Sequence, residues 1–277
     1  MTSDFAPTPI RPKRRVAVVL TNLGGPDGPD AVKPFLFNLF NDPAIIGLPG
    51  IVRTPLARLI SSRREKSAQG NYARMGGGSP LLPETRRQAE ALEARLNARL
   101  TDDEVRVFIA MRYWRPLTEE TAADVAVFGP DEVVLLPLYP QYSTTTTESV
   151  RDVVTREARG LDVRFIEDYP VDPGWVAAVV GSIRSWRAEH GDGEHLLFSY
   201  HGLPQRLARN GDPYPQRCEA STRAIVLALG LRDGEWTLTY QSRCGKERWL
   251  EPATDATLQA MAAPSSSVRA WRTNGLK

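Results

Sequence analysis

The 277-residue sequence has only two cysteines, Cys218 and Cys244. Two thiols cannot build the disulfide framework of a small secreted protein, and they are typical of a chain that works in a reducing compartment. They also fall short of the four thiolates that an iron–sulfur cluster usually takes from one chain. We therefore expect both cysteines to be packing residues, and we expect no iron–sulfur cluster.

Long apolar runs and a strong excess of charge are missing as well. No stretch approaches the length of a membrane span, and the N-terminus lacks the apolar core of a secretory signal. The formal net charge of +2 gives no reason to expect nucleic acid as a partner. Hydrophobic residues make up 42% and charged residues 25%, which is typical of a globular protein with a sizeable core. These features predict a cytoplasmic protein without an integral membrane segment.

Strand-like and helix-like segments alternate along the chain, an order typical of an α/β protein with parallel sheets. Residues 16–22 are almost continuously apolar, as a strand buried on both faces should be. The further strands are expected at 105–113, 132–138, 162–166, 195–200 and 236–240. The helices are expected at 31–41, 51–68, 84–99, 118–127, 145–159, 175–190, 214–229 and 254–262.

The segment Asp172-Pro173-Gly174 breaks this alternation, so we place a domain boundary at 168–174. Two similar α/β halves facing one another would form a cleft, the usual place for a small-molecule site. The expected organisation is a flexible basic leader at 1–15, domains at 16–168 and 169–263, and an irregular tail at 264–277.

One of the three histidines, His201, follows an apolar stretch and is followed at once by Gly202. A histidine at a strand end, held on such a turn, is able to present its ring to a cleft. Neutral imidazole there can take a proton or bind a transition metal near neutral pH. The alternative is a turn histidine without a chemical role. Motifs elsewhere in the chain are needed to choose between the two interpretations.

The strand at 16–22 ends with Asn22 and Leu23 and runs into Gly24-Gly25-Pro26. This turn does not match G-x-G-x-x-G, and Pro26 intrudes where a phosphate turn would lie, which argues against a nicotinamide cofactor. The glycines are explained by a tight turn between a strand and a helix.

A second glycine-rich run, Gly76-Gly77-Gly78, precedes Ser79 near the start of an expected helix. Glycines let the backbone approach a ligand closely, and the serine adds a hydroxyl at a helix N-terminus. Arg63 and Arg64 end the preceding helix, and together these groups suit a carboxylate or a phosphate. The alternative is a flexible connector with two solvated arginines.

The next strand closes with Arg112-Tyr113-Trp114, and the one after it closes with Tyr139-Pro140-Gln141-Tyr142-Ser143. Ligands of doubly wound folds bind at the carboxyl ends of the strands. A cation beside aromatic rings suits a flat, anionic, conjugated ligand, although an ordinary amphipathic strand end has the same composition. Four strand ends with distinctive polar or aromatic residues favour a shared binding site.

Five runs together resemble the ferrochelatase family, in the family's order and spacing over 16–258. They are MRYWRP at 111–116, LYPQYS at 138–143, GGGSP at 76–80, SYHGLP at 199–204 and QSRCGKERWLEP at 241–252. The resemblance implies two Rossmann-like halves with parallel sheets and a porphyrin cleft between them. It also implies a lyase that inserts ferrous iron into protoporphyrin IX or coproporphyrin III in haem biosynthesis, with iron and porphyrin as substrates and no further cofactor.

The resemblance also assigns roles to particular residues. His201 matches the family's cleft histidine, a metal ligand or proton acceptor, and the opposite wall is matched by Arg112 and Tyr113. Positions that hold the porphyrin propionates are matched by Arg63, Arg64 and Ser79, and positions that touch the ring are matched by Asn22 and Leu23.

The end of the chain departs from the family pattern. Ferrochelatases continue past the helix at 254–262 into a further strand and a loop whose glutamate faces the cleft histidine. Here no Asp or Glu follows Asp255, and the tail lacks an apolar run. We therefore expect a truncated or frameshifted chain with an incomplete second half, an exposed sheet edge and reduced activity. The alternatives are an inactive relative that binds porphyrin or metal without catalysis, or a chelatase for another metal or tetrapyrrole.

Overall fold

A computed structural model describes residues 13–148, 150–151, 162–192, 195–243, 245 and 247–262. The chain forms two compact units. The first consists of Met1–Leu138 with Ser149–Ile166, and the second consists of Tyr139–Glu148 with Glu167–Lys277. Each unit is described by itself below.

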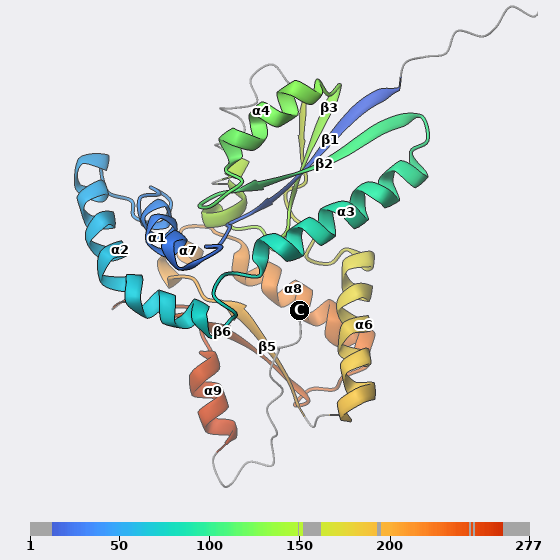
Figure 1. Cartoon of the computed structure of the whole chain (residues 1–277). Coiled ribbons are helices and arrows are strands. Elements are labelled where there is room, and N and C mark those ends of the chain that lie inside the picture. Colours follow the sequence, from blue (N-terminus) through green and yellow to red (C-terminus); the bar gives the residue numbers. More distant parts are fainter. Residues whose placement is uncertain are drawn as a thin grey trace, which may run out of the picture. The chain divides into compact units, whose positions relative to one another are not determined.

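The first unit is built on a parallel sheet of four strands in the order β2-β1-β3-β4 (Figure 1). The strands are β1 (Arg14–Asn22), β2 (Asp103–Met111), β3 (Glu132–Pro137) and β4 (Val163–Phe165). In the register of the sheet, Asn22 pairs with Met111 and Thr21 with Pro137. The carboxyl ends of β1, β2 and β3 therefore lie at one edge, where the sequence places its distinctive residues.

Side chains of β1 alternate between two hydrophobic clusters, which explains why the whole strand is apolar. Ala17 and Val19 pack with residues of β3 and of α4 (Thr118–Phe128). Val16, Val18 and Leu20 pack on the other side with residues of α3 (Leu81–Arg99). Figure 1 shows these two helices on either side of the strands. Further helices of this unit are η1 (Pro29–Ala31), α1 (Val32–Phe40) and α2 (Gly50–Ala73).

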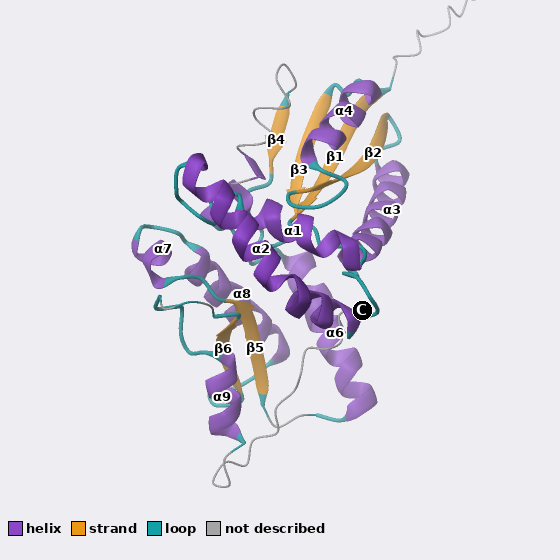
Figure 2. Ribbon diagram, turned by 60° about the vertical axis from the view of Figure 1, so that its left-hand side comes forward, coloured by secondary structure: helices purple, strands orange, loops and turns teal. Residues whose placement is uncertain are grey.

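The second unit contains a parallel pair of strands, β5 (Leu196–His201) and β6 (Trp236–Gln241), which Figure 2 shows beside its helices. The helices are α6 (Pro173–His190), α7 (Gln205–Arg209), α8 (Tyr214–Leu229) and α9 (Thr254–Met261). Its core joins α6, β5 and α8 through Val176, Val180, Ile183, Leu196 and Ile225. The expected fold class, an α/β protein with parallel sheets, is confirmed.

The expected helix at 145–159 begins as a π-helical segment, Thr144–Glu148, and residues 150–151 are α-helical. Residues 149 and 152–161 lie outside the described part of the chain. The first turn of the π-helical segment is not capped by the expected pair Thr145 and Glu148. Instead Ser143 Oγ accepts a hydrogen bond from Thr145 N at 3.2 Å. The short helix α7 was not expected, because five residues carry no helical periodicity.

The compact units differ from the predicted domains in two segments. Residues 139–148 and 167–168, which the sequence analysis assigned to the domain 16–168, belong to the second unit. The boundaries 16–168 and 169–263, and a cleft between the halves, stay predictions. The leader 1–12 and the tail 264–277 lie outside the described residues. Within the described part of the chain, no helix has the length and apolar character needed to cross a membrane.

Candidate active site

The ends of β1 and β2 continue their pairing beyond the sheet and so bring four predicted site residues together. Arg112 N donates to Asn22 O at 2.9 Å, and Tyr113 N donates to Leu23 O at 2.9 Å. The Asn22 side chain turns back on the chain, where its Oδ1 accepts from Leu23 N at 2.8 Å. Backbone hydrogen bonds therefore fix the position of this strand end.

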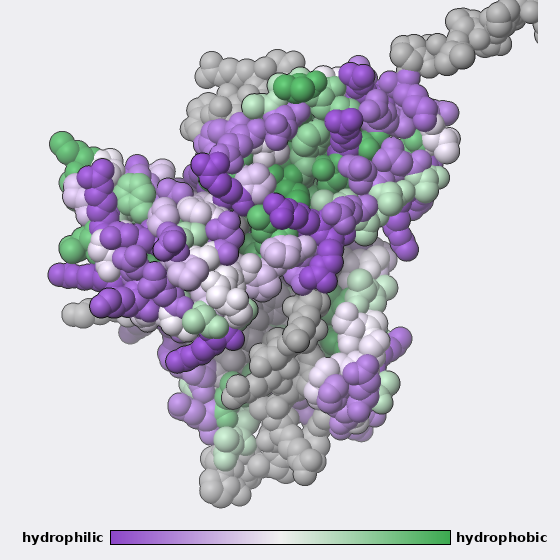
Figure 3. Space-filling view, viewed as in Figure 1, coloured by the Kyte–Doolittle hydropathy of each residue, from purple (hydrophilic) through white to green (hydrophobic). Residues whose placement is uncertain are grey.

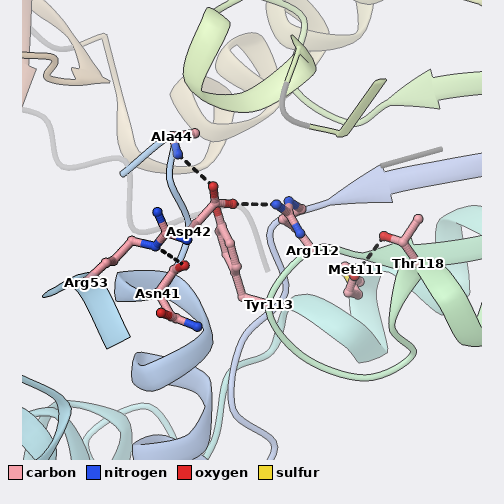
Figure 4. Close-up of polar contacts among 8 residues, drawn as sticks. All are labelled: Asn41, Asp42, Ala44, Arg53, Met111, Arg112, Tyr113 and Thr118. Atoms are coloured by element: carbon pink, nitrogen blue, oxygen red, sulfur yellow. Dashed lines mark hydrogen bonds and ion pairs between the residues drawn. The ribbon is translucent and has the colours of Figure 1, made fainter. Parts of the chain in front are cut away.

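The side chains of Arg112 and Tyr113 converge on the carboxylate of Asp42, in the loop between α1 and α2 (Figure 4). Asp42 Oδ2 lies 2.6 Å from Arg112 Nη2 and accepts from the Tyr113 hydroxyl at 2.9 Å. Its Oδ1 accepts from Ala44 N at 2.8 Å. The Asp42 side chain is 2% exposed and the Arg112 side chain 19% exposed. A buried carboxylate with an Arg partner and further donors is well satisfied.

Tyr113 is itself buried, with 1% of its surface exposed. Its ring packs with Val32, Phe35 and Leu36 of α1, and the Arg112 guanidinium carbon lies 5.4 Å from the ring centroid. With so little exposed surface, the Tyr113 ring can make almost no direct contact with a ligand. Sequence reasoning missed Asp42, because Asn41-Asp42-Pro43 reads as an ordinary turn after a helix.

The two glycine-rich turns pack against each other at the end of β1. Ser79 N donates to Pro26 O at 2.7 Å. A Cβ on Gly25 would lie 2.5 Å from Ser79 Oγ, and a Cβ on Gly78 would lie 2.9 Å from the Asp27 carbonyl. Close approach of the two backbones, rather than flexibility, thus explains both glycines. Ser79 is thereby held beside the strand end that carries Asn22.

Arg63 and Arg64 lie on exposed positions within α2 and not at its end, because the helix continues to Ala73. This helix packs against α1 through residues that include Ala68 and Tyr72. The Arg64 guanidinium carbon lies 5.5 Å from the Phe40 ring centroid, a cation–π distance. In Figure 3 the visible surface of α2 is largely hydrophilic, but hydrophobic atoms stand out at its start, where Ile51 is 86% exposed.

In the second unit, His201 is the last residue of β5 and pairs with Gln241 of β6. The turn that follows is tight, because Gly202 N donates to Gln241 O at 2.8 Å and a Cβ on Gly202 would meet the same oxygen at 2.8 Å. Only glycine fits this position without a shift of the strand pair. The turn therefore determines where His201 stands.

The surroundings of His201 favour its neutral form. Desolvation by neighbouring protein atoms lowers the pKa of the imidazole from its ordinary 6.5, although the residue keeps exposed surface. Within the described residues, no hydrogen bond holds its ring. By contrast, the His195 ring contacts Gly234 O and Thr237 Oγ1, and the His190 ring stacks on Trp186. His201 is the histidine best suited to proton or metal chemistry.

The run that follows β3 is anchored to the second unit by hydrogen bonds. Gln141 Nε2 donates to Ser221 Oγ at 2.8 Å, and Ser143 Oγ donates to Asp212 Oδ2 at 2.8 Å. The same Asp212 oxygen accepts from the Thr144 hydroxyl at 2.7 Å and from its backbone N at 3.0 Å. Asp212 is 3% exposed. Sequence reasoning did not find this residue.

Cys218 lies in the same unit and is fully buried. Burial raises the pKa of its thiol to about 12, so it is protonated at neutral pH and is a poor metal ligand. Cys244 lies outside the described residues.

Comparison with known proteins shows the family to which this chain belongs. The ferrochelatase family matches residues 15–269, almost the whole chain. This chain belongs to the ferrochelatase family. A ferrochelatase of Phenylobacterium zucineum is 57% identical over 252 residues, which cover 90% of this chain and 73% of that relative. One of Caulobacter vibrioides is 53% identical over 258 residues, which cover 92% of this chain and 74% of that relative.

As a ferrochelatase, the protein is a lyase that inserts ferrous iron into a porphyrin in haem biosynthesis. The predicted family and function are confirmed, and the alternative of an inactive binding protein is not favoured. A solved structure of an ABC-transporter solute-binding protein from Burkholderia graminis covers 82% of this chain and 56% of its own chain at 11% identity, with a TM-score of 0.28. A score that low supports no argument about this ferrochelatase.

Proposed function

We propose that His201 performs the proton or metal step of iron insertion. Metallation exchanges the pyrrole N–H protons of the porphyrin for Fe²⁺, so the site must accept protons or guide the ion as it loses water. A neutral imidazole does either. The observation that carries this role is the lowered pKa of a ring at a strand end fixed by Gly202.

The proposed porphyrin contacts come from the first unit. Arg63 and Arg64 carry exposed cations on α2, and Ser79 offers its hydroxyl beside the end of β1. Cations and a hydroxyl are suitable partners for the propionate carboxylates. Asn22 and Leu23, at the end of β1, are proposed to touch the ring itself.

Arg112 and Tyr113 take different roles in this proposal. The Arg112 side chain keeps about one fifth of its surface, so it is able to contact the porphyrin. Tyr113 is buried and hydrogen-bonded to Asp42, so we assign it a positioning role beneath Arg112. Protoporphyrin IX and coproporphyrin III are both candidate substrates. A cytoplasmic location and the absence of an iron–sulfur cluster stay predictions.

The test is an anaerobic insertion assay with the purified chain. Fe²⁺ is added to the protein with either porphyrin, and the loss of porphyrin fluorescence is followed against an enzyme-free control. We expect insertion above the uncatalysed rate, and the preferred porphyrin identifies the substrate. Porphyrin binding without insertion would instead support the inactive relative.

The role of His201 is tested by His201→Ala beside His190→Ala, a matched change at an exposed residue of α6. We expect His201→Ala to abolish insertion while porphyrin affinity is retained, and His190→Ala to insert iron normally. Normal turnover in His201→Ala would remove this residue from the mechanism.

A further inference from the structure

Asp42 is held in place by groups that do not depend on Arg112. Its Oδ1 accepts from the backbone of Ala44, and its Oδ2 accepts from the hydroxyl of the buried Tyr113. The loop that carries it is tied down as well, because Arg53 Nε donates to Asn41 O at 2.8 Å (Figure 4). The carboxylate is therefore a preorganised acceptor.

Arg112 is fixed at both ends. Its backbone is hydrogen-bonded to Asn22 O, and its guanidinium meets Asp42 at 2.6 Å beside the Tyr113 ring. An arginine free in solution loses considerable rotamer entropy when it is ordered by a ligand. Here that cost is met during folding, and the positive charge is balanced by a carboxylate below it.

We propose that Asp42 and Arg112 act as a neutral pair, in which Asp42 is a positioning residue. The pair presents the flat guanidinium to the macrocycle, whereas recognition of the carboxylates lies with Arg63, Arg64 and Ser79. The inference rests on the proposed function, because it takes Arg112 as a porphyrin contact. The physical reason is desolvation: an apolar ring covers a balanced pair at lower cost than an unpaired cation.

This proposal differs from two simpler roles for the same contact. If the ion pair only stabilised the fold, its loss would lower the melting temperature without changing which porphyrins bind. If Arg112 were a carboxylate clamp, its removal would weaken binding of acidic porphyrins whatever residue stood at position 42. The ratio of affinities for a porphyrin diacid and its uncharged dimethyl ester separates the three roles.

The experiment measures this ratio by fluorescence titration with deuteroporphyrin and its dimethyl ester, kept monomeric in a little non-ionic detergent. In Asp42→Asn the Arg112 charge is no longer balanced by the Asp42 carboxylate, so the ratio of diacid to ester affinity rises about fivefold. The double variant Asp42→Asn, Arg112→Gln removes both charges of the pair, so the ratio returns to within about twofold of the wild-type value.

Three outcomes overturn the proposal. An unchanged ratio in Asp42→Asn means that the pair only stabilises the fold. A ratio in the double variant far below wild type means that Arg112 is a clamp. Unchanged affinities for both ligands in every variant remove Arg112 from the porphyrin site. Failure of the wild-type chain to insert iron is a separate result that bears on the proposed function alone.

Two further variants keep the test decisive. If Asp42→Asn does not fold, Arg112→Gln replaces it: the Asp42 carboxylate without the Arg112 charge lowers the ratio, and the double variant restores it. Tyr113→Phe removes the neutral hydrogen bond to the same Asp42 oxygen without changing a charge. We expect it to lower the melting temperature and to leave the ratio within about twofold of wild type, since both charges of the Asp42–Arg112 pair remain.

Discussion

The hydroxyl of Ser79 occupies the space that a side chain on Gly25 would need. A Cβ at Gly25 would lie 2.5 Å from Ser79 Oγ and 2.6 Å from Ser79 Cβ. The two residues are 54 positions apart in the chain, by subtraction of their numbers, yet each limits what the other can be. The first turn after β1 and the second glycine-rich turn therefore form one packed structure.

This contact predicts the effect of Gly25→Ala. The added methyl group pushes Ser79 away from the end of β1, and such overpacking costs about 1–3 kcal/mol of unfolding free energy. We expect a loss of porphyrin affinity together with reduced stability, measured by fluorescence titration and urea denaturation. Gly28→Ala is the matched control, because nothing lies within 4 Å of a Cβ there. Equal effects of the two changes would contradict the packing argument.

A second prediction concerns the turn after His201. In Gly202→Ala the new methyl group meets the Gln241 carbonyl, and the strand pair must shift to make room. We expect the rate of iron insertion to fall at least about tenfold, because small displacements of a reacting group are costly. Gly181→Ala, in α6, where a Cβ has open space, is expected to leave the rate unchanged. A Gly202→Ala variant with normal rate and stability would show that the turn tolerates a side chain.

Asp212 is expected to be important for stability although it was not found from the sequence. Asp212→Ala leaves Ser143 Oγ and both donors of Thr144 without their acceptor, and it removes the bond from Tyr214 N. We expect a loss of about 2–4 kcal/mol in the free energy of unfolding. Urea denaturation measures it. Asp192→Ala, at a side chain that is 89% exposed, should change stability by less than about 0.5 kcal/mol.

The depressed pKa of His201 predicts a pH dependence with a definite sign. In the unfolded chain the imidazole titrates near 6.5, and in the folded chain it titrates lower. Between these two values the unfolded state binds more protons, so stability from this group is fully present above pH 6.5. It is lost as the pH falls through that window to the folded-state pKa.

The measurement is an NMR titration of the imidazole protons, with His201 assigned by its absence in His201→Ala. We expect its midpoint below 6.5, and an acid limb of insertion activity with the same midpoint. A midpoint at or above 6.5 would show that burial is not the dominant influence on this ring.

Local sequence patterns were sufficient for most of the secondary structure. The continuous apolar run at 16–22 indicated a strand buried on both faces, and β1 has that burial. The helix expected at 214–229 is α8, with the same bounds. The segment after β3 was harder, because its first turn is capped by Ser143 and Asp212 rather than by the neighbours that a capping box requires.

The sequence by itself determined the family, the order of the elements and the residues at the strand ends, because these depend on neighbours in the chain and on motifs read in order. Only the tertiary structure decided that Tyr113 is buried, that Arg112 is paired with Asp42 and that Asp212 anchors the run after β3. The reason is physical: each of these contacts joins residues about 70 positions apart. No local periodicity specifies which donor a buried carboxylate will meet once the chain has folded.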